Sequence, residues 1–132
     1  MSDKKKVLIV DDEDIVRRLV ARVLSENGYE AIVAENGENG IKRMSENPDM
    51  IVTDFNYKTP GMNGVLFARR VREAGYERPI IVASSKIQEI MDTYTDAFGI
   101  QNAVFNGYLS KPFRPNQLLD ELARVLAEPQ SQ

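Results

Sequence analysis

Short apolar runs alternate along this chain with longer segments in which apolar residues recur at helical spacing. The first run, from Val7 to Val10, has no polar residue and is rich in β-branched side chains. Such a run is typical of a parallel strand that is buried on both faces. Further short runs that are mainly apolar lie at residues 30–34, 50–53, 80–83 and 108–109. The pattern therefore predicts five strands, of which the last is the weakest.

Five amphipathic segments, each predicted to be a helix, follow these strands in turn. In the first, six apolar residues recur every three or four positions, and Asn27-Gly28 supplies a stop signal. These six residues are Ile15, Val16, Leu19, Val20, Val23 and Leu24. The other helices are expected at residues 37–44, 64–74, 87–94 and 118–126. In the second helix we expect Ile41 and Met44 to face inward.

Strands that alternate with helices are typical of a doubly wound α/β domain, in which helices cover both faces of a parallel sheet. We therefore predict the α/β class with a five-stranded parallel sheet. A length of 132 residues suits one domain. We expect this domain to occupy residues 1–127 and residues 128–132 to form a polar C-terminal tail.

Composition narrows the possible chemistry. The chain has no His and no Cys, which excludes a His general base, a thiolate metal site and a phosphohistidine carried by this chain. Any metal must be bound by oxygen, which favours Mg²⁺, Ca²⁺ or Mn²⁺. The net charge of −3 does not indicate a nucleic-acid surface, and no apolar run approaches the roughly 18 residues of a membrane span. We expect a cytoplasmic protein that contacts neither nucleic acid nor membrane.

Chemically active side chains follow four of the predicted strands. Asp11 and Asp12 follow the first strand, Asp54 the third, Ser84 the fourth and Lys111 the fifth. In an open parallel sheet, ligands bind outside the carboxyl ends of the strands. We therefore expect these residues to converge on one edge of the sheet.

This set of side chains suits phosphoryl transfer. Clustered carboxylates repel one another, and Mg²⁺ can hold one or two of them close while it accepts phosphate oxygens. A carboxylate can then act as the nucleophile. Lys111 can pair with a phosphoryl oxygen as a point charge, and the Ser84 hydroxyl can donate a hydrogen bond to another.

Four segments together resemble the receiver domain of two-component response regulators. They are Val7-Leu8-Ile9-Val10-Asp11-Asp12-Glu13, the isolated Asp54, Pro79-Ile80-Ile81-Val82-Ala83-Ser84-Ser85, and Tyr108-Leu109-Ser110-Lys111-Pro112-Phe113. The resemblance extends from about Lys5 to Ala127. It implies the flavodoxin-like (βα)5 fold, a doubly wound five-stranded parallel sheet with strand order 2-1-3-4-5.

The resemblance also implies roles for residues around the acidic cluster. Asp54 matches the phosphoacceptor of the family. Asp11 and Asp12 match the acidic pair that binds Mg²⁺, or Mn²⁺ in its place, with Asp12 the more direct ligand. Asp54 itself belongs to this metal site. Asn56 matches the position that contributes its backbone carbonyl to the metal.

Further roles implied by the resemblance fall on the fourth and fifth strands. Ser84 matches the hydroxyl residue and Lys111 the lysine that act on the phosphoryl group. The Lys111-Pro112 bond matches one that is cis in the family. Tyr108 matches an aromatic switch that turns inward when Ser84 moves toward the phosphoryl group. Glu13 is expected to be a solvated neighbour of the acidic pair, although it could contact Lys111.

The chain departs from the family in two places. Five residues separate Asp54 from Pro60, which is more than the family usually has. Because the carbonyl of Asn56 precedes most of this extra length, we expect metal binding to survive. The stretch from Ser84 to Tyr108 is also longer than usual, with the excess within residues 95–106, where it should alter the fourth helix or the loop after it.

We therefore expect a stand-alone response regulator that takes a phosphoryl group on Asp54 from a sensor histidine kinase or a histidine phosphotransfer protein. It should act on no other substrate, catalysing only its own phosphorylation and dephosphorylation. Output should pass to a protein target through the fourth helix, fifth strand and last helix.

Three other classes of protein remain as alternatives. One is a receiver-like binding module that is not phosphorylated. The second is a phosphohydrolase of the haloacid-dehalogenase type, which needs a later acidic pair. Here that pair would have to be Asp120 and Glu121, deep in the last helix. The third, a flavodoxin-like cofactor carrier, lacks a phosphate loop after the first strand.

Overall fold

Strands and helices alternate along the chain in the computed structural model, which describes residues 4–57, 61–92 and 104–127. The strands are β1 (Lys5–Val10), β2 (Tyr29–Ala34), β3 (Met50–Asp54), β4 (Ile80–Ser84) and β5 (Gly107–Ser110). The helices are α1 (Asp14–Glu26), α2 (Gly37–Arg43), α3 (Gly64–Glu73), α4 (Ile87–Met91) and α5 (Pro115–Ala127), and a 3-10 turn, η1 (Met44–Glu46), follows α2.

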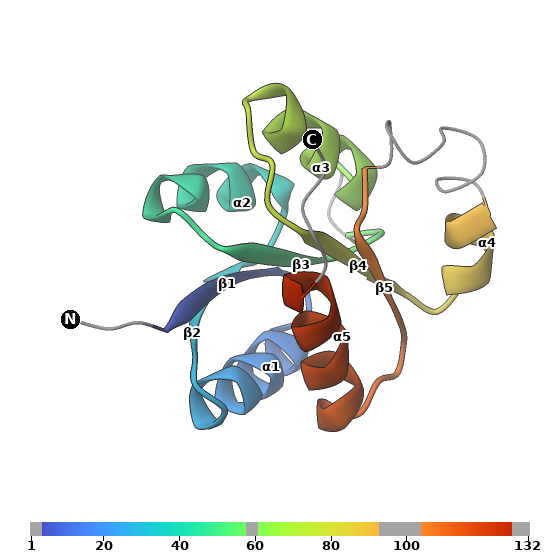
Figure 1. Ribbon diagram of the computed structural model, residues 1–132. Coiled ribbons are helices and arrows are strands. Elements are labelled where there is room, and N and C mark those ends of the chain that lie inside the picture. Colours follow the sequence, from blue (N-terminus) through green and yellow to red (C-terminus); the bar gives the residue numbers. More distant parts are fainter. Residues whose placement is uncertain (1–3, 58–60, 93–103, 128–132) are drawn as a thin grey trace.

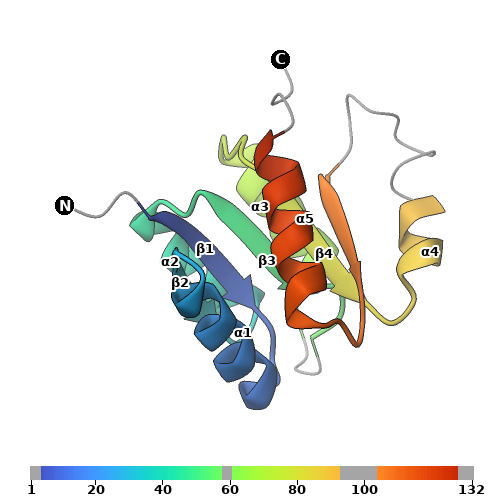
Figure 2. The same ribbon diagram turned by 60° about the horizontal axis from the view of Figure 1, so that its bottom comes forward.

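All neighbouring strands pair in parallel, in the order β2-β1-β3-β4-β5. This arrangement confirms the expected fold. Figures 1 and 2 show α1 and α5 on one face of the sheet and α2 and α3 on the other. All five parallel strands end at the same edge of the sheet. The polar residues singled out above lie at this edge, where the carboxyl ends of the strands meet.

Each face of the sheet has its own apolar core. Along β1, Val7 and Ile9 pack with the cluster that contains residues of α1 and α5, whereas Leu8 and Val10 pack with residues of α3. This alternation follows from the two-residue period of a strand. All four side chains are buried, as expected for a strand covered on both faces.

The inward orientation expected for Ile41 is wrong, because its side chain is 37% exposed. The buried positions of α2 are Gly37 and Gly40. A Cβ added to Gly40 would come within 2.8 Å of the ring of Phe67, so the helix lies too close to α3 for larger side chains on that side. Met44 is partly buried against this core, in η1 rather than in the helix.

Several boundaries differ from the sequence-based prediction. The predicted fourth helix ran to Tyr94, which lies outside the described residues, and α4 is described from Ile87 to Met91. The last helix begins earlier than expected, at Pro115, because proline is favoured in the first turn, where its missing N–H is not needed. Of the longer stretch at residues 95–106, only 104–106 are described, and the tail at 128–132 is not.

Among the described residues, no helix combines the length and the apolar character that crossing a bilayer requires.

Candidate functional site

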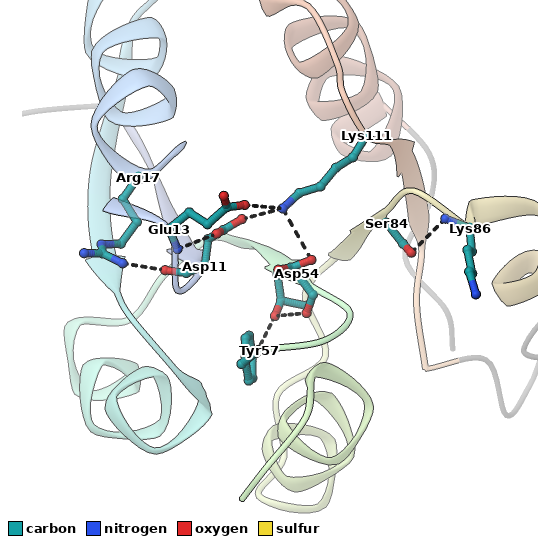
Figure 3. A network of polar contacts seen from close by, with 9 residues as sticks. Asp11, Glu13, Arg17, Asp54, Tyr57, Ser84, Lys86 and Lys111 are labelled. Carbon is teal, nitrogen blue, oxygen red and sulfur yellow. Dashed lines mark hydrogen bonds and ion pairs between the residues drawn. The ribbon is translucent and has the colours of Figure 1, made fainter. Parts of the chain in front are cut away.

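The polar residues at the strand ends meet at one edge of the sheet (Figure 3). Strand register brings this about, since β1 pairs Val10 with Thr53 and β3 pairs Asp54 with Ala83. Asp11 therefore leaves β1 beside the last residue of β3. The strands β1, β3 and β4 end almost level, so the polar residues at or directly after their ends lie at the same edge of the sheet.

Three carboxylates form the centre of this space. One oxygen each from Asp11, Asp12 and Asp54 can be chosen so that all three lie within 4.8 Å of one another. Asp11 is buried, and the other two are half-buried. All the side-chain donors are hard oxygens, the type of ligand that Mg²⁺ and Mn²⁺ prefer.

Lys111 supplies the cation that faces this cluster. Its ammonium Nζ lies 2.9 Å from Asp11 Oδ2 and 3.4 Å from Asp54 Oδ1, and Figure 3 shows it reaching between these two carboxylates. Glu13 Oε1 is 3.9 Å from the same nitrogen, so Glu13 does reach Lys111. The cis Lys111-Pro112 bond, expected from the family resemblance, is present.

Burial and neighbouring charges together shift the pKa values of Asp54 and Lys111. Burial raises the pKa of Asp54 to about 6; Lys111 opposes this shift, while Asp11 and Asp12 add to it. Burial alone would lower the pKa of Lys111, but hydrogen bonding and attraction to Asp11 and Asp54 outweigh it and raise that pKa. Among the described residues of the site, one ammonium faces three carboxylates, so the cluster favours an additional cation.

Asp11 is fixed by contacts that the sequence did not reveal. Its Oδ1 accepts a hydrogen bond of 2.9 Å from the backbone N–H of Glu13. The guanidinium of Arg17 donates to the backbone carbonyl of Asp11 at 2.7 Å and pairs with Asp14 at 3.1 Å. The spacing of Asp14 and Arg17, three residues apart on a helix, is the one signal that could have identified Arg17.

Ser84 ends β4 next to the acidic cluster. Its Oγ accepts a hydrogen bond of 3.0 Å from the backbone N–H of Lys86, whose ammonium points away from Asp54 in Figure 3. On the neighbouring strand, Tyr108 is partly buried, and its ring meets that of Phe105 edge-on with centroids 6.3 Å apart. Ser84 and Tyr108 thus lie on adjacent strands, as the expected switch requires.

Asn56 lies in the loop after β3, two residues beyond Asp54, with an exposed side chain. The next residue, Tyr57, is only 8% exposed, and sequence reasoning did not single it out. Its hydroxyl lies 2.6 Å from Thr53 Oγ1. Burial raises the pKa of Tyr57 well above its usual range, so the phenol stays protonated.

Comparison with known proteins shows the family of this chain. It matches the model of the response regulator receiver domain over residues 7–123, and it belongs to that family. Phosphorylation on aspartate and Mg²⁺ binding are typical of these domains. This membership argues against the haloacid-dehalogenase alternative. In addition, Glu121 is bonded to the backbone of β5 rather than directed at the acidic cluster.

Three relatives illustrate the likeness. The phosphate regulon transcriptional regulatory protein PhoB of Pseudomonas aeruginosa is 34% identical over 92% of this chain and 52% of its own length. The solved structure of the chemotaxis response regulator CheY4 of Vibrio cholerae is 31% identical, with a TM-score of 0.79, over 92% of this chain and 98% of that one. The response regulator TrrA of Thermotoga maritima, solved in complex with Mg²⁺ and BeF, is 28% identical, with a TM-score of 0.74, over the same shares.

The chain spans about half the length of the curated relatives it matches. Some of those relatives are transcriptional regulators by name, whereas CheY4 is a chemotaxis protein of similar length to this chain. The stand-alone arrangement and the absence of nucleic-acid contacts therefore stay predictions.

Proposed function

We propose that this chain is a response regulator switch that accepts a phosphoryl group on Asp54 from the phosphohistidine of a sensor kinase or phosphotransfer protein. One observation carries the proposal: Lys111 bridges Asp11 and Asp54 in a cluster where, within the part of the chain that the structure describes, carboxylates outnumber cations. A metal ion bound to this cluster supplies the missing positive charge. Lys111, which reaches the acceptor, can bind an oxygen of the incoming phosphoryl group.

The metal of the proposed site is Mg²⁺, with Mn²⁺ as the alternative. The fit rests on the donor set, because Asp11, Asp12 and Asp54 offer carboxylate oxygens within 4.8 Å of one another. The backbone carbonyl of Asn56 would be the fourth protein ligand. When bound, the ion offsets charge on the phosphoryl oxygens and on the carboxylates. The solved complex of TrrA with Mg²⁺ and BeF supports such a site here.

The chain's own residues then carry out the transfer. A carboxylate oxygen of Asp54 attacks phosphorus, the P–N bond to the donor imidazole breaks, and an acyl phosphate forms on Asp54. With a pKa of about 6, Asp54 is mostly ionised at neutral pH and ready to act as a nucleophile. Lys111 and the Ser84 hydroxyl bind phosphoryl oxygens. Water later hydrolyses the acyl phosphate and resets the switch.

A groove beside Lys111 supports docking of the donor protein on α1. It has a volume of about 380 Å³ and is lined mainly by apolar side chains, together with Glu13, Ser85 and Lys111. Leu19 lines it and is 59% exposed, and Ile15 nearby on α1 is 74% exposed. Apolar side chains this exposed indicate a surface that a partner covers, and the groove shares Lys111 and Glu13 with the acceptor site.

The test is the intact mass of the protein after incubation with acetyl phosphate and Mg²⁺. We expect one phosphoryl adduct on the wild type, none on Asp54→Asn, and an unchanged adduct on Asp120→Asn, the matched change at an exposed acid of α5. A full adduct on Asp54→Asn would refute the assignment. An absent adduct on the wild type, with donor kinases also inactive, would favour a binding module that is not phosphorylated.

That second candidate, a binding module that is not phosphorylated, is supported by one feature, the long spacer between Asp54 and Pro60.

The proposal of a response regulator also includes a cytoplasmic location and output to a protein target through α4, β5 and α5. Phosphotransfer profiling against the histidine kinases of the host would identify the donor. Steady turnover of a phosphomonoester, rather than a single phosphorylation, would contradict both candidates.

A further inference from the structure

Among the described residues of the loop between β3 and α3, Tyr57 is the one that is buried. It lies three positions after Asp54 and its side chain is 8% exposed, while the preceding Asn56 is exposed. Its ring lies on the side of Asp54 away from Lys111 (Figure 3). Burying a tyrosine beside an acidic cluster requires a partner for its hydroxyl, and that partner is Thr53.

The hydrogen bonds form a chain that ends on the acceptor residue. Thr53 Oγ1 is 3.0 Å from the backbone carbonyl of Asp54 and donates to it. A hydroxyl has one hydrogen, so in the contact of 2.6 Å between Thr53 Oγ1 and Tyr57 Oη, the tyrosine is the donor. The Tyr57 hydroxyl thereby ties the loop back to the last two residues of β3.

The residue on the other side of Asn56 is also anchored. The N–H of Phe55 donates to the carbonyl of Ala83 at 3.0 Å, and its carbonyl accepts from the N–H of Gly64 at 2.8 Å. Asn56 therefore lies between a residue held by backbone bonds and one held by its side chain. The remaining length of the loop, up to Pro60, comes after this pair of anchors.

We propose that Tyr57 is a positioning residue for the metal site. It holds the peptide that carries the Asn56 carbonyl and separates that carbonyl from the extra length of the loop. The inference rests on the proposed Mg²⁺ site. Its physical basis is preorganisation: a ligand that is already in place loses less conformational entropy when the ion binds.

The central variant is Tyr57→Phe, which removes one hydroxyl and keeps the ring. The matched control is Tyr76→Phe, because Tyr76 is also partly buried and its hydroxyl donates to the Pro48 carbonyl at 3.1 Å, away from the acidic cluster. Isothermal titration of the unphosphorylated protein with Mg²⁺ gives the affinity. We expect Tyr57→Phe to bind Mg²⁺ about tenfold more weakly, a typical effect of removing an outer-shell partner, and Tyr76→Phe to bind like the wild type.

A second variant tests the same chain of hydrogen bonds from its other end. Thr53→Val keeps the shape of a buried side chain and should weaken Mg²⁺ binding by a similar factor. Combining it with Tyr57→Phe should add little to the effect that comes from the Tyr57–Thr53 contact, since each change alone already removes that hydrogen bond. If Tyr57→Phe does not fold, Thr53→Val alone decides the outcome.

Phosphorylation by acetyl phosphate at increasing Mg²⁺ separates positioning from general damage. Tyr57→Phe should need about tenfold more Mg²⁺ for its half-maximal rate and should regain the wild-type rate at saturation. Unchanged Mg²⁺ affinity in both variants, or an equal loss in Tyr76→Phe, would overturn the role of Tyr57. If the wild type itself binds no Mg²⁺, the proposed function fails together with this inference. A wild type and a Tyr57→Phe variant that bind Mg²⁺ equally well would instead contradict only the role of Tyr57.

Discussion

The carboxylate of Asp54 is proposed to be the nucleophile, yet its surroundings in the folded protein disfavour its negative charge. Its side chain is 12% exposed and shares its surroundings with Asp11 and Asp12. Burial, the larger effect, and repulsion by these neighbours together outweigh the attraction of Lys111. The folded protein therefore holds a carboxylate at a position where its ionised form is destabilised. This arrangement is useful for a group that must receive a cation and a phosphoryl group, but it lowers stability when both are absent.

We predict that Asp54→Asn stabilises the metal-free protein at neutral pH. The folded pKa of about 6 lies above the ordinary value of 3.8, so the folded state binds the proton more tightly than the unfolded state. The contribution of Asp54 to the stability of the wild type should therefore fall as pH rises from about 4 to about 6. The variant should not show this fall, and its advantage at neutral pH should approach about 3 kcal/mol. Urea unfolding in the presence of a chelator measures both proteins across this range.

Asp120→Asn provides the control for the stability measurement, because Asp120 is exposed on α5. Its unfolding free energy should follow that of the wild type at every pH. A wild type whose stability does not fall between about pH 4 and pH 6 relative to Asp54→Asn would show that the carboxylate is not destabilised by its burial.

Sequence reasoning identified the site residues at the ends of strands, and the family resemblance added Asn56, whereas Tyr57 of the loop and Arg17 of α1 were missed. The sequence allowed us to predict Asp11, Asp54 and Ser84, because an apolar run shows where a strand ends and a parallel sheet brings those ends together. Tyr57 and Arg17 could not be predicted in this way. Their partners are hydroxyl or carbonyl groups of nearby residues, and such contacts depend on the path of the backbone rather than on any periodic pattern.

Helix α1 has two apolar surfaces, and only one of them belongs to the core. Val20 and Leu24 are buried, while Ile15 and Leu19 are exposed. The groove next to Leu19 is also lined by Lys111. Burial against the sheet accounts for the first pair only, so the second pair supports an intermolecular role.

We predict that Leu19→Lys slows phosphotransfer from the protein donor by about tenfold or more, as expected for losing an apolar residue at the centre of an interface. Phosphorylation by acetyl phosphate should not change, because this small donor needs no docking surface. Rates of both reactions are measured by the appearance of the phosphorylated protein, using the kinase found by profiling. Equal slowing of both reactions would place the effect of Leu19 in the chemistry and not in docking.

Leu66→Lys is the matched control for this experiment. Leu66 is also an exposed leucine on a helix, 41% exposed on α3, and it is not part of the groove beside Lys111. The two variants carry the same change in charge and size. Loss of transfer in both would mean that added positive charge, rather than the α1 surface, disturbs the donor complex.

The edge strand β5 is connected to α5 through one carboxylate. Glu121 Oε2 accepts a hydrogen bond of 2.9 Å from the backbone N–H of Tyr108 and lies 2.7 Å from Arg124. A Cβ on Gly107 would approach this oxygen to 2.7 Å, so glycine lets the carboxylate reach the edge. Capping an edge N–H in this way leaves it unavailable to a foreign strand.

We predict that Glu121→Gln lowers the unfolding free energy by about 1 kcal/mol at neutral pH, the size expected for losing the charge from these hydrogen bonds. Burial alone would raise the pKa of Glu121, but hydrogen bonds from Arg124 and Tyr108 outweigh it and hold that pKa below its usual 4.5. The contribution of the carboxylate is therefore present above the ordinary value and lost as pH falls through the lowered one. Urea unfolding at neutral pH and below about pH 4 should show the difference only at the higher pH. A difference that persists in acid would assign the effect to side-chain shape.

At the scale of elements, the pattern worked best where both faces of a strand are buried. The runs that became β1, β3 and β4 were recognisable because nearly every residue faces a core. Helix α2 was harder to interpret, since its buried residues are Gly37 and Gly40, and glycine gives no hydrophobic signal. The large branched residue of this helix, Ile41, is exposed, because the glycine side of the helix is the one that lies close to α3.

At the scale of the whole molecule, periodicity predicted the layers but not the order of the strands. Alternation of strands and helices requires a parallel sheet with helices on both faces. The order β2-β1-β3-β4-β5 came from the family resemblance of four segments, because many orders satisfy the same alternation. Once that order is known, the position of the site follows. It lies where β1 and β3 are neighbours and the chain turns away to opposite faces.

The same order suggests how a signal crosses the molecule. Ser84 ends β4, and β4 pairs with β5 so that Val82 lies beside Tyr108 and Ser84 beside Ser110. The backbone of Tyr108 is bonded to Glu121 of α5, and its ring contacts Phe105. A shift of Ser84 toward a phosphoryl group on Asp54 therefore has a short physical route to α5, through two adjacent strands.

We predict that a phosphoryl mimic, beryllium fluoride with Mg²⁺, changes amide hydrogen exchange in residues 84–92 and 104–113 as well as around Asp54. The reason is that ligands shift an existing equilibrium by their differential affinity for its states, and the route through Ser84 and Tyr108 links both regions. Ser84→Ala should retain the change around Asp54 and lose most of the distant change, whereas Asp54→Asn should lose both. Exchange that changes only in the loop from Asp54 to Gly64, in the wild type, would show that Ser84 and Tyr108 are not coupled. Output would then have to leave through the loop itself or the neighbouring helix α3.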